Sequence, residues 1–114
     1  MIIVRITMNV LPEKNKEVMQ TLLSIVEPAV KTKGCLSYEI FCDMEDKHVF
    51  SMIEEWETRA DLDRHIQSEI FGVLLGTKSL LAKPAEFNIH TVSHSEGIEA
   101  VKALRGKGTS RKYL

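Results

Sequence analysis

One histidine, His65, stands among apolar residues in the middle of the chain. Leu62 and Ile66 lie at spacings that place them with His65 on one face of a helix. A lone histidine on an apolar face is commonly a satisfied core residue. With an ordinary pKa of about 6.5, the same imidazole could also act as a base at neutral pH. The sequence leaves both interpretations of His65 open.

Two glutamates and a tryptophan, Glu54, Glu55 and Trp56, stand just ahead of this helix. An aromatic residue between a strand and a helix is usually core packing, although an indole is also a flat wall for an aromatic ligand. Because side chains alternate across a strand, one of the two glutamates must face inward. A buried carboxylate needs a partner, such as Arg5, His65 or a residue of a second copy. We expect an orienting role here and assign Glu55 to the site.

Hydrophobic periodicity shows which elements would position these residues. Alternating apolar residues predict strands at 2–10, 36–42, 48–56 and 87–92. Helical spacing predicts helices over 12–34 and 70–81. Thr58, with Asp61 three residues later, predicts the start of a further helical segment that carries His65. The order β-α-β-β-α-β is the ferredoxin-like split βαβ pattern of the α+β class.

The end of the chain forms a second part. We assign residues 1–93 to the ferredoxin-like domain and residues 94–114 to a short helix with a flexible basic tail. Ser93, with Glu96 three residues later, predicts a helix cap. The apolar stripe that follows is narrow and would be a marginal helix alone, so we expect it to dock on its own protomer or on a partner. Its members are Ile98, Val101 and Leu104.

The first and third strands carry apolar residues on both faces, as Ile6 against Ile3 and Met52 against Ile53 illustrate. Two helices cover only one face of the sheet in this topology, so the other face must meet a second surface. A second copy of the chain is the simplest source of that surface. We therefore predict a homodimer.

Composition limits the class of protein. The chain has 114 residues, a formal net charge of −1 and 44% hydrophobic residues, which indicates one globular domain and argues against non-specific nucleic-acid binding. No segment approaches the roughly 18 apolar residues of a membrane span, and the start of the sequence lacks signal-peptide features. We expect a soluble, cytoplasmic protein. Its charge is uneven, because residues 43–69 are acidic and residues 97–114 are basic.

Sequence motifs for cofactors are missing. There is no glycine-rich nucleotide loop, no H-E-x-x-H and no recognisable set of two histidines and a carboxylate. The two cysteines, Cys35 and Cys42, lack the histidine spacing of a zinc site and form no disulfide framework. We expect neither a metal nor an organic cofactor.

Three motifs follow one another along the chain. They are GCLSYE at 34–39, E-E-W at 54–56 and L-x-x-H-x-x-S-x-x-F at 62–71. Over about residues 2–93 the sequence resembles the antibiotic biosynthesis monooxygenase family of dimeric α+β barrel proteins. The motifs are fairly specific for the fold and poor guides to activity. Proteins of this type include quinol monooxygenases, polyketide oxygenases, haem-degrading enzymes and enzymes that degrade signal molecules.

The resemblance implies a cofactor-independent monooxygenase. A hydroquinone or another electron-rich phenolic or polycyclic substrate would lose a proton and pass one electron to O₂. The radicals would combine, and the peroxide would collapse to a quinone. The protein would supply a dry apolar pocket, a base and orientation. The implied base is His65, and the implied substrate-binding residues are Trp56, Tyr38, Thr7, Phe71, Leu75 and Glu55.

Other branches of the family give alternatives. The haem-degrading branch is disfavoured, because Thr7, His65 and Leu75 stand where that branch has an asparagine, a tryptophan and the iron-ligating histidine. A small-molecule-binding or stress-associated dimer without catalysis would use the same pocket. An enzyme acting on a phosphorylated, sugar-like metabolite would need inward basic residues, for which only Arg5 and Arg64 are candidates.

Overall fold

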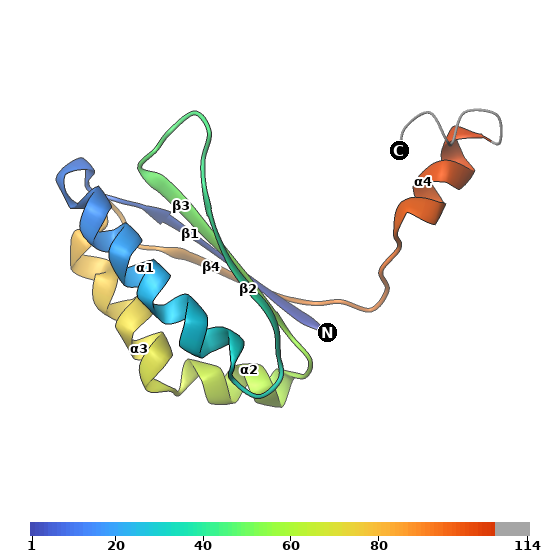
Figure 1. Cartoon of the computed structure of the whole chain (residues 1–114), viewed down its shortest axis with the longest axis horizontal. Coiled ribbons are helices and arrows are strands. Elements are labelled where there is room, and N and C mark those ends of the chain that lie inside the picture. The colour runs from blue at the N-terminus through green and yellow to red at the C-terminus, as the bar shows by residue number, and fades with distance from the viewer. Residues whose placement is uncertain (107–114) are drawn as a thin grey trace.

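The fold is α+β and ferredoxin-like, as the sequence pattern predicts (Figure 1). The computed structural model describes residues 1–106, so the last part of the predicted tail lies outside the described residues. The strands are β1 (Ile2–Asn9), β2 (Cys35–Cys42), β3 (Val49–Trp56) and β4 (Glu86–Thr91). The α-helices are α1 (Asn15–Val30), α2 (Arg59–Ile66), α3 (Glu69–Leu75) and α4 (Ile98–Arg105). Short 3₁₀ turns are η1 (Pro12–Lys14) and η2 (Gly76–Leu80).

The strands form one antiparallel sheet in the order β2-β3-β1-β4. In the central pair, Ile2 lies opposite Trp56, and Met8 lies opposite Phe50. Helices α1, α2 and α3 lie on one side of this sheet (Figure 1). The other side therefore has no helical cover in the described chain.

The covered face of the sheet forms the core. Because side chains alternate along a strand, every second residue of β1 and β3 points to the helices. On β1 and β3 these buried residues are Ile2, Val4, Ile6, Met8, Phe50, Met52, Glu54 and Trp56. Helix α1 meets them with the apolar stripe Val18, Leu22, Ile25 and Ala29. A single carboxylate, Glu54, thus lies in an otherwise apolar row of β3.

The turn between α1 and β2 fixes the start of α2. Gly34 has φ +84°, and a side chain there would collide with Asp61. The Gly34 carbonyl accepts a hydrogen bond from the amide of Glu57 at 2.8 Å. Helix α1 ends at Val30, four residues before the predicted end, because the chain already turns towards this glycine.

Capped helix starts place His65 and Phe71 against the sheet. The Thr58 hydroxyl accepts from the Asp61 amide at 3.1 Å, which confirms the predicted cap of α2. The Ser68 hydroxyl accepts from the Phe71 amide at 3.4 Å and starts α3. The break between these two short helices allows both rings to point into the core.

The open face of the sheet is partly apolar. Ile3, Val49 and Ile53 are half-buried there, and Phe41 is 46% exposed. An antiparallel sheet with apolar residues on both faces commonly packs against another surface. We therefore expect a second copy of the chain to cover this face.

Replacing Ile53 with lysine should convert the expected dimer to monomer. The lysine charge would be buried against the second copy without a partner, which should raise the dimer dissociation constant by about 100-fold or more. Sedimentation equilibrium over a range of protein concentrations measures this. Gln20→Lys, an exposed change on α1, is the control and should leave the dimer intact. A wild-type chain that sediments as a monomer at all concentrations contradicts the prediction.

Helix α4 stands apart from the sheet and its helices at the end of an extended segment (Figure 1). It begins at Ile98 with Gly97 before it and no side-chain cap, so the cap predicted from Ser93 and Glu96 is wrong. The chain leaves the sheet extended after Thr91 and turns into the helix only at the glycine. No helix in the described residues is long and apolar enough to cross a membrane.

Candidate active site

His65 lies at the centre of a cluster of aromatic rings. Its side chain, in the last turn of α2, belongs to a residue only 1% exposed. The ring centroid of Trp56 is 4.5 Å away with the planes tilted by 31°. Tyr38 and Phe71 meet the imidazole edge-on at 5.7 and 5.6 Å. Strands β2 and β3 and helix α3 thus each supply one wall around the histidine.

Glu54 is the carboxylate of this cluster. It is completely buried, and its Oε1 accepts a hydrogen bond from the Trp56 indole nitrogen at 3.0 Å. The same oxygen lies 3.8 Å from Nε2 of His65. Glu55 follows on the opposite face of β3, so the described chain does not bring it to His65. Strand alternation is the reason, because Glu54 shares the parity of Trp56 and Glu55 does not.

Unsatisfied polar atoms concentrate in this cluster. Within residues 1–106, the buried side-chain nitrogen and oxygen atoms without a hydrogen-bond partner belong to three residues. They are the hydroxyl of Tyr38, Oε2 of Glu54, and both ring nitrogens of His65. Buried polar groups in native proteins are nearly always paired, and exceptions mark functional sites or bound water. These atoms are therefore available to a ligand.

Burial controls the protonation of all three groups. It lowers the pKa of His65. It raises the pKa of Glu54, and the hydrogen bond from Trp56 opposes part of this shift. Burial, followed by the charge of Glu54, raises the pKa of Tyr38. At pH 7 the imidazole is thus neutral, with one N–H donor and one free lone pair that can accept a proton.

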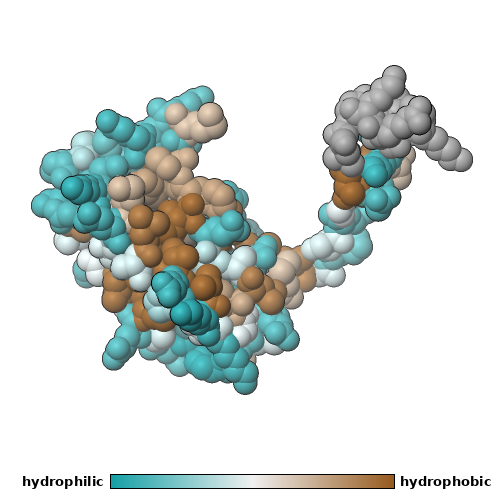
Figure 2. Space-filling model, viewed as in Figure 1, coloured by the Kyte–Doolittle hydropathy of each residue, from teal (hydrophilic) through white to brown (hydrophobic). Residues whose placement is uncertain are grey.

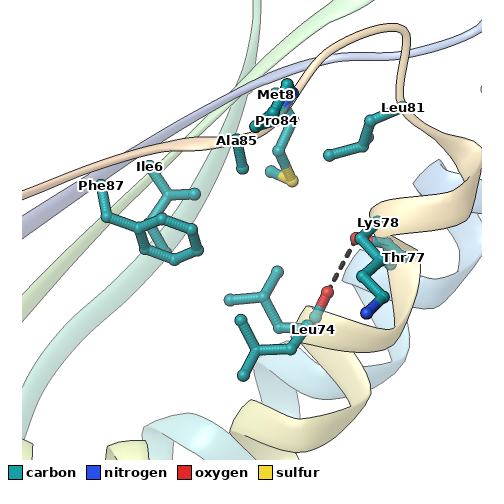
Figure 3. A pocket seen from close by; sticks show the side chains of 10 residues that line it. Ile6, Met8, Leu74, Thr77, Lys78, Leu81, Pro84, Ala85 and Phe87 are labelled. Atoms are coloured by element: carbon teal, nitrogen blue, oxygen red, sulfur yellow. Dashed lines mark hydrogen bonds between the residues drawn. The ribbon is translucent and has the colours of Figure 1, made fainter.

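An apolar pocket opens beside the cluster, between η2 and the β4 edge (Figure 3). Its volume is about 350 Å³, within the range of small-molecule sites. Among the described residues that line it, Lys78 is the one with a charged side chain. The lining residues are Ile6, Met8, Leu74, Leu75, Thr77, Lys78, Leu81, Pro84, Ala85 and Phe87.

Two phenylalanine rings separate this pocket from His65. Phe87 lines the pocket, and its ring centroid lies 6.1 Å from that of Phe71. Phe71 in turn lies 5.6 Å from the imidazole and is 6% exposed. A ligand in the pocket therefore reaches the histidine only when the Phe71 ring moves aside.

The structure divides the residues predicted for the site into three groups. His65, Trp56, Tyr38 and Phe71 form the buried cluster, and Leu75 lines the neighbouring pocket. Thr7 and Glu55 lie on the open face of the sheet, opposite Ser51 and Ile3 respectively. In the described chain neither reaches His65, because odd-numbered positions of β1 and β3 point away from the helices.

Sequence reasoning missed Lys78 and Phe87 and chose the wrong member of the glutamate pair. The parity shared by Glu54 and Trp56 was a usable signal. Lys78 and Phe87 carried no such signal. They line the same pocket only because η2 folds back against the edge of the sheet. The described residues contain no group of three or more histidine, cysteine, aspartate or glutamate side chains that could hold a metal ion.

Comparison with known proteins gives the family. The family described as antibiotic biosynthesis monooxygenase matches residues 1–74. The chain belongs to this family. The residues that match the family include the whole buried cluster. Lys78 and Phe87, on the pocket wall, lie beyond the matched residues. Family membership supports a monooxygenase-like function.

Individual relatives are similar along most of the chain. An uncharacterised protein of Synechocystis is 32% identical over 83% of this chain, which spans only 65% of that relative's length. YcnE of Bacillus subtilis, provisionally named a monooxygenase, is 28% identical over 75% of this chain and 92% of its own. A conserved protein of Methanosarcina mazei has a crystal structure with a TM-score of 0.74. It is 33% identical, over 78% of this chain and 89% of its own.

Proposed function

We propose that this chain is a cofactor-independent monooxygenase that oxidises a hydroquinone or another electron-rich phenol with O₂. One observation carries the proposal. The unsatisfied buried polar side-chain atoms of residues 1–106 converge around a neutral His65, inside a cage of aromatic rings. That arrangement offers polar partners to the hydroxyl group of an aromatic molecule that enters from the neighbouring apolar pocket when the Phe71 ring moves aside.

His65 is the base of the proposed reaction. The substrate hydroxyl donates to the free imidazole nitrogen and gives up its proton there. The resulting anion passes one electron to O₂, and the two radicals combine in a carbon–oxygen bond to a ring carbon. The imidazolium returns its proton to the outer oxygen of the peroxide. The ring carbon then loses its hydrogen as a proton while the O–O bond breaks. This proton joins the departing hydroxide as water, and a carbonyl remains. One oxygen atom ends in the quinone and the other in water.

Glu54 and Trp56 position the base. The indole hydrogen bond holds Oε1 of Glu54 3.8 Å from Nε2 of His65. A carboxyl group at this distance favours the imidazole orientation in which Nε2 faces Glu54 and Nδ1 is left for the substrate. The apolar surroundings exclude water, which protects the radical pair from side reactions.

Oxygen consumption tests the proposal. The purified protein is mixed with a panel of hydroquinones and naphthols in an oxygen electrode, and the rate of spontaneous oxidation is subtracted. We expect uptake proportional to protein concentration, and one atom from ¹⁸O₂ in the quinone product. If no member of the panel gives protein-dependent uptake, the oxygenase assignment is wrong.

The alternative is a small-molecule-binding dimer without catalysis. The closure of the cluster favours it, because His65 is 1% exposed and Phe71 stands between the histidine and the pocket. A binding protein would show thermal stabilisation by the same phenols with no oxygen uptake. An oxygenase would show both.

Lys78 should favour substrates that carry a negative charge. Lys78 is the one charged residue among the described residues that line the pocket, and none of the ion pairs found within the described residues includes it. Replacing Lys78 with methionine should raise KM for a carboxylated naphthol about fivefold and change kcat less than twofold. Steady-state kinetics at low salt measures this, with uncharged 1-naphthol and the variant Lys83→Met as controls. Equal effects on both substrates contradict the prediction.

A further inference from the structure

Helix α4 has an apolar stripe that is largely exposed in the described chain. Ile98 is 40% exposed, Val101 49% and Leu104 91%. An isolated helix of this length is marginal in water, so most of its stability must come from packing. Figure 2 shows apolar side chains on this helix, which the extended segment after β4 holds away from the rest of the described chain.

A matching surface lies at the hairpin between β2 and β3. The hollow there, of about 530 Å³, is lined by Phe41, Cys42, Asp43, Met44, Glu45 and Ser51. Met44 is fully exposed and Phe41 is 46% exposed, so two large apolar side chains are uncovered there. Ser51 and Phe41 also belong to the open face of the sheet, which makes the hollow continuous with the expected dimer interface.

Charge complements the apolar match. Asp43, Glu45 and Asp46 make the hairpin acidic. From residue 97 to the end of the chain, five residues are basic and one is acidic. The sequence from residue 97 onward thus combines the apolar stripe of α4 with a net positive charge, most of which follows the helix, and the hollow combines apolar side chains with negative charge.

The fold separates α4 from the hairpin of its own protomer. Strand β4 leaves the sheet beside Ile2. The hairpin lies at the Met8 end of the sheet, where it joins β3 to β2, the edge strand on the opposite side from β4. The two points are about 27 Å apart from strand rise and spacing. Figure 1 shows α4 and the hairpin on different sides of the body.

We propose that α4 of one protomer docks into the β2–β3 hairpin hollow of a second copy of this chain. In a two-fold dimer with antiparallel sheets, the end where β4 leaves one protomer lies near the hairpin end of the other. Two identical contacts then form, one at each end of the dimer. They extend the interface made by the open faces of the sheets and are independent of any catalysis.

The native Cys42 makes this proposal testable by cross-linking. It is exposed and lines the hollow. In the full-length Val101→Cys variant, mild oxidation with diamide should form a disulfide between the new thiol and Cys42 of the other copy. Most of the protein should then run as a covalent dimer in non-reducing gel electrophoresis. The dimer band should persist in a Cys35→Ser background and vanish in a Cys42→Ser background.

Three outcomes of the cross-linking overturn the proposal. A dimer band that survives Cys42→Ser places the new thiol against something other than the hairpin. Loss of free thiols without a dimer band shows that α4 docks on its own protomer. Absence of any cross-link, in a variant that still sediments as a dimer, also counts against the contact.

A double-mutant cycle gives a second measurement. Met44 and Leu104 are 101% and 91% exposed, so glutamate at either position leaves the protomer fold intact. Each single variant should weaken the dimer about tenfold in sedimentation equilibrium. The double variant should weaken it little further, because both changes remove the same contact. Additive effects, or no effect of either change, contradict direct docking.

Discussion

Replacing His65 with alanine should lower kcat/KM for protein-dependent oxygen uptake by about 100- to 10,000-fold. The reason is that His65 holds the free nitrogen lone pair that takes the substrate proton in the proposed reaction. Burial holds Tyr38 protonated and raises the pKa of Glu54. The imidazole alone combines a free lone pair with a lowered pKa.

The pH dependence of the rate distinguishes a base from a packing residue. Because burial lowers the pKa of His65 below its ordinary value of 6.5, the wild-type rate should decline as the imidazole becomes protonated, with a midpoint below pH 6.5. This acid limb should disappear in the variant, and added imidazole should restore part of the rate.

Two further variants control for folding. His65→Gln keeps a hydrogen-bonding side chain of similar size without a basic nitrogen, so it should fold and remain as inactive as the alanine variant. His94→Ala removes an exposed histidine of the extended segment between β4 and α4 and should leave the rate unchanged. If His65→Gln retains wild-type turnover, the histidine is not the base.

The order of the elements could be predicted because it depends on local periodicity. Alternation along β1 and β3 and the cap at Thr58 are properties of neighbouring residues, and the structure confirms them. The same local rule could have chosen between the glutamates, because Trp56 fixes which parity of β3 faces the helices. The error over Glu55 came from treating the pair without its strand partners.

The set of residues that form the site depends on contacts between distant parts of the chain, which local sequence patterns do not predict. His65, Tyr38 and Trp56 meet because α2 crosses over β2 and β3, and the family motifs anticipated that group. Thr7 and Leu75 were assigned by position in a remote alignment. The structure places the first on the open face and the second in a separate pocket. Likewise, nothing in the sequence signals that Phe71 closes His65 off from that pocket.

Replacing Glu54 with glutamine should stabilise the protein at pH 8, by about 2 kcal/mol in the free energy of unfolding. Burial raises the pKa of Glu54, so the folded protein favours the protonated carboxyl group. The stability from this group is fully present below the unfolded pKa of 4.5, and it is lost as pH rises through the folded value. Glutamine resembles the protonated form and can still accept the Trp56 hydrogen bond at every pH.

His65 changes stability in the opposite direction. Its pKa is lowered in the fold, so stability is present above the unfolded value of 6.5 and lost as pH falls through the folded value. In the wild type, acidification also protonates Glu54, and the stability gained at Glu54 opposes the stability lost at His65. In Glu54→Gln only the loss of stability at His65 remains. Acidification from pH 8 to 5 should therefore destabilise the variant more than the wild type.

Urea unfolding at pH 8 and pH 5, at one fixed protein concentration, measures both effects. Glu55→Gln, on the open face of the same strand, is the matched control and should shift stability by less than about 0.5 kcal/mol. A Glu54→Gln variant that is less stable than the wild type at pH 8 would show that the fold prefers an ionised Glu54. The cluster would then hold an ion pair with a protonated His65, and an imidazolium could not take the substrate proton.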